Sequence, residues 1–171
     1  IVMILMNDFR AQPEELLQAE MDAVEKVIRS GWYILGKEVE KFESAWGKLC
    51  DVIHVIGVGN GMDALEIGIR ILLEPGDEVI TTPMTAFATI LAIIRAGATP
   101  VLADVNPETA LLDIDSVKRC ISSSTKAILL VHLYGQIREM EQWKNLCDNN
   151  NLYLLEDCAQ AHMASWNQQA A

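Results

Sequence analysis

Residues 76–105 read GDEVITTPMTAFATILAIIRAGATPVLADV, and this stretch decides the fold class. The run at residues 78–81 has the length and apolar composition of a buried strand, and Pro83 follows it. Residues 86–96 then form an apolar helical segment that Gly97 ends, before a second short strand at residues 100–103. Parallel strands need a crossover connection, which is usually a helix. The stretch therefore predicts two parallel strands of one sheet joined by a helix.

The same alternation extends toward both ends of the chain. Further strands are predicted at residues 54–58, 126–131 and 152–156. Further helices are predicted from Pro13 to Ser30 and at residues 37–50, 64–72, 114–121 and 138–149. Five short strands that alternate with helices predict a mostly parallel, doubly wound α/β sheet with helices on both faces. Residues 1–50 are expected to form a helical arm over this sheet, and residues 51–171 the α/β domain.

Composition limits the classes of partner. The chain has 171 residues, 51% of them hydrophobic, and a net charge of −11, which suits one globular domain and argues against nucleic acid as a partner. The four cysteines show neither a Cys-x-x-Cys pair nor zinc-finger spacing, so neither a structural metal nor a disulfide framework is expected. No apolar run is long enough to cross a membrane, and the start, IVMILMNDF, lacks the features of a signal peptide. We therefore expect a cytoplasmic protein.

Ligands of open parallel sheets bind beyond the carboxyl ends of the strands, and the sequence is informative at three such places. The first is VGNGMDAL at residues 58–65, where a strand is expected to turn into a helix. Gly59 and Gly61 allow the backbone to approach a ligand, and the free N–H groups of the helix N-terminus would stabilise a phosphate. Such glycines also occur where the chain only turns. The pattern lacks the third glycine of a dinucleotide-binding turn.

The second place is TTPMTAFATILAI at residues 81–93, which brings hydroxyl groups and one aromatic ring to a strand end. Phe87 could contact a ligand, although a position in the core of its helix is the more ordinary role. Thr85 could serve only as a helix N-cap.

The third place is EDCAQAH at residues 156–162. A carboxylate at the end of a buried strand costs desolvation energy unless a cation or a hydrogen-bond donor meets it, which makes Asp157 the most suggestive residue. Its alternative role is to cap the next turn. Gln160, His162 and His132 would complete the rim of a site or be ordinary polar residues, and for His132 a buried, hydrogen-bonded imidazole is favoured.

One ligand would unite the three places, namely a flat, cationic heteroaromatic ring that carries a phosphate. The phosphate would lie at Gly61, the ring beside an aromatic side chain, and the protonated ring nitrogen at Asp157. Pyridoxal phosphate has this shape, and an aspartate at its ring nitrogen keeps that nitrogen protonated. We therefore expect pyridoxal phosphate as the cofactor.

Five segments of the chain, in order and spacing, resemble the DegT/DnrJ/EryC1/StrS family of sugar aminotransferases. They are SGWYILGKEVEKFE, GVGNGMDALEIGIR, PGDEVITTPMTAFATILAIIRAGATPVLADVNPET, TKAILLVHLYGQ and LLEDCAQAHMASW. The resemblance implies the large domain of a fold-type I pyridoxal-phosphate enzyme, usually a homodimer with its active sites at the subunit interface. It further implies transfer of an amino group from glutamate to a nucleotide-linked keto sugar, of which a dTDP-linked 3-keto-6-deoxyhexose is the narrower expectation.

The resemblance also implies roles for individual residues. It places Asp157 at the pyridine nitrogen, Gln160 near the phenolic oxygen, Phe87 on the ring, and Gly61, Met62 and Asp63 at the phosphate. The chain departs from the family pattern at three positions. Met62 stands where the family usually has threonine or serine, Phe87 is shifted by one residue, and Met163 replaces a frequent glycine.

The largest departure concerns the Schiff-base lysine, which the family carries some way beyond the block that ends at His162. The chain has no lysine after Lys144, so we expect it to be the amino-terminal part of a larger enzyme and inactive alone. Two alternatives stay open, a family dehydratase without the lysine and a non-catalytic binding or dimerisation module. A generic nucleotide-binding or regulator domain ranks last, because it predicts acids at the end of the first strand and residues 54–58 supply none.

Overall fold

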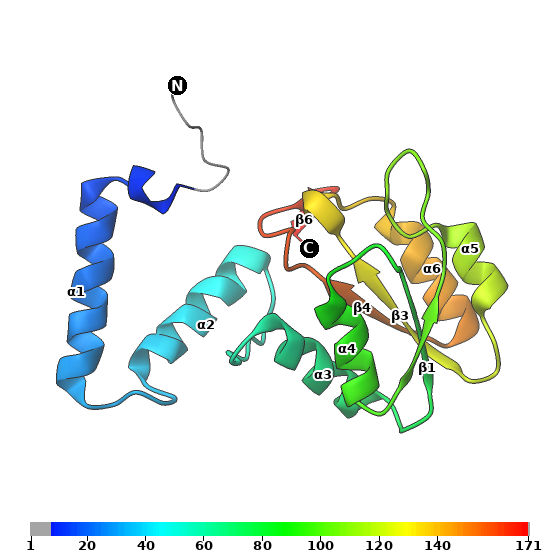
Figure 1. Ribbon diagram of the computed structural model, residues 1–171, viewed down its shortest axis with the longest axis horizontal. Helices are drawn as coiled ribbons and strands as arrows, with labels where there is room; N and C mark the ends of the chain where they lie inside the picture. The colour runs from blue at the N-terminus through cyan, green and yellow to red at the C-terminus, as the bar shows by residue number, and fades with distance from the viewer. Residues whose placement is uncertain (1–7, 171) are drawn as a thin grey trace.

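The computed structural model describes residues 8–170, so most of the apolar start of the chain lies outside the described residues. A four-stranded, wholly parallel sheet forms its centre, in the order β2-β1-β3-β4 (Figure 1). The strands are β1 (Glu78–Thr81), β2 (Thr99–Leu102), β3 (Thr125–Val131) and β4 (Tyr153–Asp157). The predicted α/β fold class is confirmed, and these four predicted strands are present within one residue of their expected bounds.

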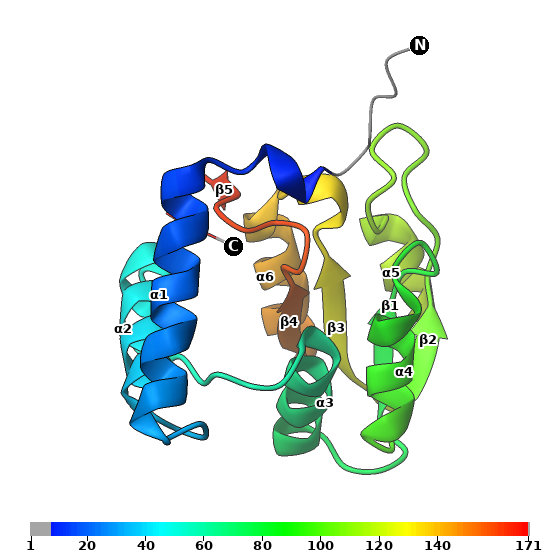
Figure 2. The same ribbon diagram turned by 60° about the vertical axis from the view of Figure 1, so that its left-hand side comes forward.

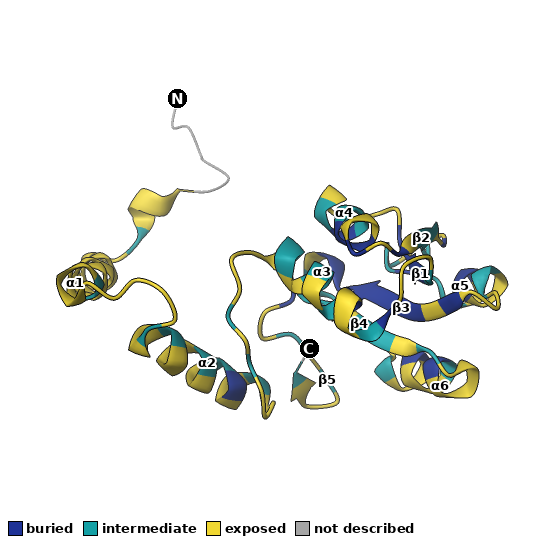
Figure 3. Cartoon of the chain, turned by 90° about the horizontal axis from the view of Figure 1, so that it is seen from below, coloured by how far each residue is buried: buried dark blue, intermediate teal, exposed yellow. Residues whose placement is uncertain are grey.

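Helices cover both faces of the sheet (Figure 3). One face packs against α3 (Gly61–Leu72) and α4 (Phe87–Arg95), and the other against α5 (Ile114–Cys120) and α6 (Met140–Asn150). The side chains of β3 alternate between the two layers, since Leu129 joins the α3/α4 cluster while Ile128 and Leu130 join the α5/α6 cluster. Burial on both faces explains why this strand is a continuous apolar run.

The strand–helix–strand unit of residues 76–105 forms as its sequence predicts. Gly97 has a φ of 87°, a left-handed backbone conformation that favours glycine, and it ends α4 before β2 begins. The parallel register pairs Glu78 with Thr99 and Thr81 with Leu102. This unit holds the first turn of α4 beyond the carboxyl end of β1.

The strand predicted at residues 54–58 is wrong, because the structure contains no strand there. A strand needs a neighbour to exchange backbone hydrogen bonds, and none of the described strands pairs with this segment. The N–H of Gly57 instead donates to the Glu43 Oε1 atom at 2.7 Å. Ile56 is 81% exposed, which shows how little the apolar pattern alone guarantees burial.

Residues 9–50 form a short 3-10 turn, η1 (Phe9–Ala11), and two helices, α1 (Glu14–Ser30) and α2 (Lys37–Cys50). The second helix, α2, lies between α1 and the α/β layer (Figures 1 and 2). None of the residues of α1 is buried. Lys26 on α1 donates to the Glu38 carboxylate on α2 at 2.8 Å, which ties the two helices together. No helix among the described residues combines the length and apolarity that crossing a bilayer requires.

The end of the described chain forms a small hairpin that the sequence analysis did not predict. Its strands are β5 (Ser165–Trp166) and β6 (Gln169–Ala170), and it follows the turn after β4. The indole N–H of Trp166 donates to the Glu141 carboxylate of α6 at 2.6 Å, and Asn167 donates to the other oxygen of that carboxylate. These contacts fix the hairpin against the α5/α6 side of the sheet.

Candidate active site

The last two residues of β4, Glu156 and Asp157, are both acidic, and their side chains point to opposite faces of the sheet. Leu155 packs with the α3/α4 cluster and Leu154 with the α5/α6 cluster. Because successive strand residues point to opposite faces, Asp157 projects to the α3/α4 side and Glu156 to the α5/α6 side. The hydrogen-bond partners of the two carboxylates, described below, agree with this alternation.

Asp157 receives two hydrogen bonds from the protein. Thr89 of α4 donates its hydroxyl to Asp157 Oδ2 at 2.9 Å, and the Ala159 N–H donates to Oδ1 at 3.1 Å. The carboxylate therefore caps its own turn, as the alternative interpretation held, and is also fixed to a helix 68 positions away in the sequence. Each carboxylate oxygen has a second lone pair, so the group can still accept a hydrogen bond from a ligand.

The α3 N-terminus follows the first glycine-containing turn. Asn60 is its N-cap, and its side-chain oxygen accepts from the Asp63 N–H at 2.9 Å. Among the described residues, the N–H groups of Gly61 and Met62 have no acceptor, as expected for the first turn of a helix. A Cβ built on Gly61 would meet no atom within 4 Å, so the side-chain position of this residue is open. An anion would be stabilised there by the free N–H groups and the helix dipole.

Phe87 is the first residue of α4 and is 73% exposed. The interpretation of Phe87 as a core residue is therefore wrong, and its ring is available to a ligand. Thr85 does not cap the helix either, because the N-cap is Ala86 and no side chain caps it. The hydroxyl of Thr85 lies 2.8 Å from that of Thr89 instead.

Gln160 and His162 lie on the turn after β4. Gln160 accepts from the Tyr134 N–H at 2.8 Å through Oε1, which leaves its amide NH₂ group free to donate to a ligand. The His162 ring meets the Trp46 ring of α2 edge to face, with ring centroids 5.6 Å apart. This contact brings α2 to the same end of the domain.

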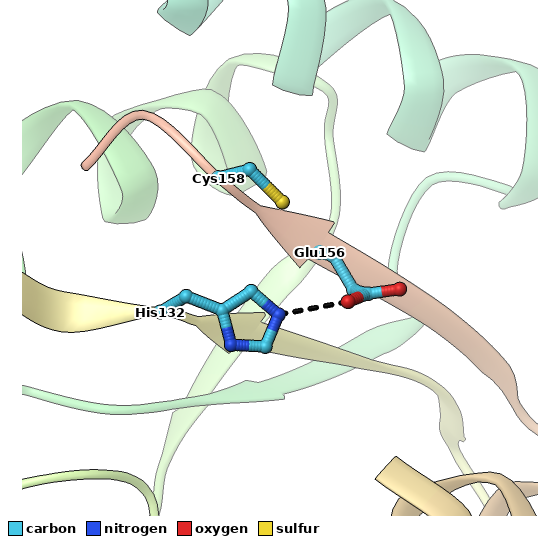
Figure 4. A group of neighbouring side chains, drawn as sticks. All are labelled: His132, Glu156 and Cys158. Carbon is cyan, nitrogen blue, oxygen red and sulfur yellow. Dashed lines mark hydrogen bonds and ion pairs between the residues drawn. The ribbon is translucent and has the colours of Figure 1, made fainter. Parts of the chain in front are cut away.

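His132, Glu156 and Cys158 form a cluster on the opposite face of the sheet (Figure 4). The His132 side chain is 4% exposed, and its Nε2 atom lies 2.8 Å from Glu156 Oε2. This hydrogen bond satisfies the buried imidazole, the role favoured for His132 by the sequence. Burial, with the nearby Glu156 and Asp157 carboxylates, raises the pKa of the Cys158 thiol to about 12. The thiol is therefore protonated, and not nucleophilic, near neutral pH.

The α3/α4 side thus presents donors and an acceptor that fit pyridoxal phosphate. The free N–H groups of Gly61 and Met62 suit the phosphate, the exposed Phe87 suits the ring, and Asp157 suits a protonated ring nitrogen. Met62 offers no hydroxyl group, so an anion here would be held by the backbone N–H groups. Sequence reasoning missed Asn60 and Thr89. An asparagine directly before a helix could have revealed the first, but Thr89 carried no such local signal.

Comparison with known proteins assigns the chain to a family. The model of the DegT/DnrJ/EryC1/StrS aminotransferase family matches residues 14–171. The dTDP-3-amino-3,6-dideoxy-alpha-D-galactopyranose transaminase of Aneurinibacillus thermoaerophilus is 47% identical over 146 residues, which cover 85% of this chain and 40% of that protein. The dTDP-3-amino-3,4,6-trideoxy-alpha-D-glucose transaminase of Streptomyces venezuelae is 42% identical over 161 residues, which cover 93% and 42%. The chain thus spans about two fifths of the length of these relatives.

Solved structures give the same assignment. Streptomyces venezuelae DesV in complex with a ketimine intermediate matches with a TM-score of 0.87 and 40% identity, over 92% of this chain and 43% of that chain. An Escherichia coli GDP-4-keto-6-deoxy-D-mannose-3-dehydratase with bound hydrated PLP matches with a TM-score of 0.82 and 26% identity, over 89% and 41%. The family match, the relatives and the fold agree: the chain belongs to the DegT/DnrJ/EryC1/StrS aminotransferase family.

Proposed function

We propose that this chain forms the cofactor-binding part of a cytoplasmic, pyridoxal-phosphate-dependent aminotransferase. The enzyme would move an amino group from glutamate to a nucleotide-linked keto sugar, with a dTDP-linked 3-keto-6-deoxyhexose as the favoured substrate. The relatives named as dTDP-sugar transaminases, at 42–47% identity, support this choice over the dehydratase, whose structure shares 26% identity.

The observation that carries the proposal is the convergence of three unlike groups at one end and on one face of the sheet. Asp157 ends β4, Phe87 begins α4, and the free N–H groups of Gly61 and Met62 begin α3. Asp157 is held to α4 by Thr89, so the acid and the aromatic ring share one rigid support. When bound, the cofactor supplies the electron sink of amino transfer. Asp157 would hold a proton on its ring nitrogen, and Gln160 would donate to its phenolic oxygen.

The catalytic lysine is part of the proposal as well. The lysines at positions 26, 41, 118 and 144 form surface ion pairs with acids. Lys37 and Lys48 lie in the first and last turns of α2, and Lys126 lies at the amino end of β3, opposite the candidate site. We therefore propose that the lysine comes from polypeptide beyond residues 1–171. The intact mass of the natural gene product tests this, because a chain of this length alone would refute it.

Binding of pyridoxamine phosphate tests the cofactor site, since this form of the cofactor needs no bond to a lysine. We expect saturable binding by isothermal titration calorimetry, and at least about tenfold weaker binding in D157N, which removes one charge-assisted hydrogen bond. D148N is the matched control, because Asp148 is an exposed acid of α6 paired with Lys144. No binding by the unaltered chain, or equal losses in both variants, would refute the site.

We further propose that α1 contributes to a homodimer interface. Its Leu17, Met21, Val24 and Ile28 side chains are 41–59% exposed and share one face of the helix. Sedimentation of the chain should show a dimer that M21E disrupts, because a charge in an apolar interface must be desolvated. D22N, a change on another face of the same helix, where Asp22 accepts a hydrogen bond from Gln18, should leave the dimer intact. A monomer at all concentrations would remove this part of the proposal.

A further inference from the structure

We infer that Thr89 is a positioning residue for Asp157, and that it sets the acid relative to the ring-binding end of α4. The inference rests on the proposed function, since the ligand that benefits is the pyridine ring of the cofactor. It concerns a residue that does not touch the ring itself and acts only through the carboxylate.

The direction of the hydrogen bonds follows from the chemistry of the groups. A carboxylate has no proton to donate, so the proton between Thr89 and Asp157 belongs to Thr89. A hydroxyl carries a single proton, so the proton in the 2.8 Å contact between Thr85 and Thr89 must come from Thr85. The three groups therefore form one directed chain, from Thr85 through Thr89 to Asp157 Oδ2.

Burial makes this chain rigid. Thr89 is 1% exposed, so water cannot replace either of its partners. A buried hydroxyl without a partner costs free energy, which means that rotation of the Asp157 side chain would break the bond and leave Thr89 unsatisfied. The second oxygen of Asp157 is held by the Ala159 N–H at 3.1 Å. With both oxygens held, the carboxylate has one orientation before any ligand arrives.

The position of Thr89 in α4 relates the orientation of the carboxylate to the Phe87 ring. Thr89 is the third residue of α4 and Phe87 is the first, so both belong to the first turn of one helix. Thr89 faces the sheet and is buried, while Phe87 is exposed. The bond from Thr89 to Asp157 therefore holds the acid beside the first turn of α4, from which the Phe87 ring projects. A flat ligand that stacks on Phe87 would find the acceptor for its ring nitrogen already in place.

The test compares variants of the chain for binding of pyridoxamine phosphate labelled with ¹⁵N in the ring. In T89V, which keeps the shape but loses the donor, we expect about tenfold weaker binding, the size expected for one hydrogen bond to a charged group. The ¹⁵N resonance should also move toward that of the unprotonated ring. T89S, which keeps the hydroxyl, should restore both. T85V, which removes only the outer donor, should show a smaller change in the same direction.

T81V is the matched control, because Thr81 is also fully buried and donates its hydroxyl to the Leu129 carbonyl at 2.9 Å. T81V should lower stability but leave the ¹⁵N resonance unchanged, which separates a positioning role from a merely structural one. If T89V does not fold, T85V and T89S still carry the comparison.

The outcomes separate this inference from the proposed function. Binding by the unaltered chain with unchanged affinity and ¹⁵N resonance in T89V would overturn the inference and leave the proposed function standing. A resonance that shifts equally in T81V would overturn it too. Failure of the unaltered chain to bind pyridoxamine phosphate would overturn the proposed function, and the cofactor role of Thr89 with it.

Discussion

Glu156 and Asp157 are neighbours in sequence, and replacing each in turn should produce two different defects. In E156L the carboxylate that pairs with His132 is replaced by an apolar side chain of similar size. His132 is 4% exposed, so water cannot take over the lost bond. A buried polar atom without a partner costs about 1–3 kcal/mol, so we expect the free energy of unfolding to fall by about 2 kcal/mol. E156Q, whose amide can still pair with the ring, should lose less than about 1 kcal/mol.

Urea denaturation followed by circular dichroism measures this loss. With a slope of about 2 kcal/mol per molar urea, a loss of 2 kcal/mol moves the midpoint by about 1 M. Pyridoxamine phosphate should bind E156L with unchanged affinity, because Glu156 projects to the α5/α6 face. D157N should show weakened binding instead. Its single amide oxygen can replace only one of the two carboxylate oxygens that accept from Thr89 and from the Ala159 N–H.

Two results would refute this reasoning about the two faces. If E156L weakened binding as much as D157N, both carboxylates would belong to one site and the alternation of β4 would have no functional consequence. If E156L were as stable as the unaltered chain, the His132 imidazole would have another partner. Added Zn²⁺ gives a further check, because stabilisation of the unaltered chain by Zn²⁺ but not of E156L would show that the cluster is a metal site.

Three further predictions concern groups outside this pair. Because burial raises the pKa of Cys158 to about 12, its alkylation by iodoacetamide at pH 8 should be at least about tenfold slower in the folded chain than in urea. Peptide mass spectrometry measures the two rates. Hydrogen bonds from Lys26 and Lys41 lower the pKa of Glu38 from 4.5 to about 2. The stability that the α1–α2 ion pair contributes should be complete above pH 4.5 and lost as the pH falls through 2. NMR of the Glu38 carboxyl group measures this titration. M163G should raise the free energy of unfolding by about 1 kcal/mol, measured by thermal unfolding. Met163 has a φ of 66°, a left-handed conformation that glycine adopts without strain, and its side chain is 70% exposed. A lower stability of M163G would show that the Met163 side chain makes a needed contact.

The elements that the sequence predicted well are those with local signals. α2 has the expected bounds, and α1 begins after Pro13 and ends at Gly31, whose φ is 67°. Proline, glycine and the apolar period act within a few residues, so no knowledge of the rest of the fold was needed. The strand at residues 54–58 failed for the complementary reason. Its apolar pattern is local, but its hydrogen-bond partner has to come from elsewhere in the fold.

The candidate site divides in the same way. Asp157, Phe87 and Gly61 stand beside strand ends or helix starts, where a sequence pattern can mark them. Thr89 stands within the apolar helix segment FATILAIIR, where a threonine reads as an ordinary helix residue. Its role depends on a carboxylate 68 positions away and on the face to which that carboxylate points. The period of two along β4 predicts the face, but only the packing of α4 on the sheet supplies the hydroxyl that meets it. A buried polar side chain in an apolar helix is therefore a reason to look for a partner on the strand that it covers, and here that partner is the acid on which the proposed cofactor site depends.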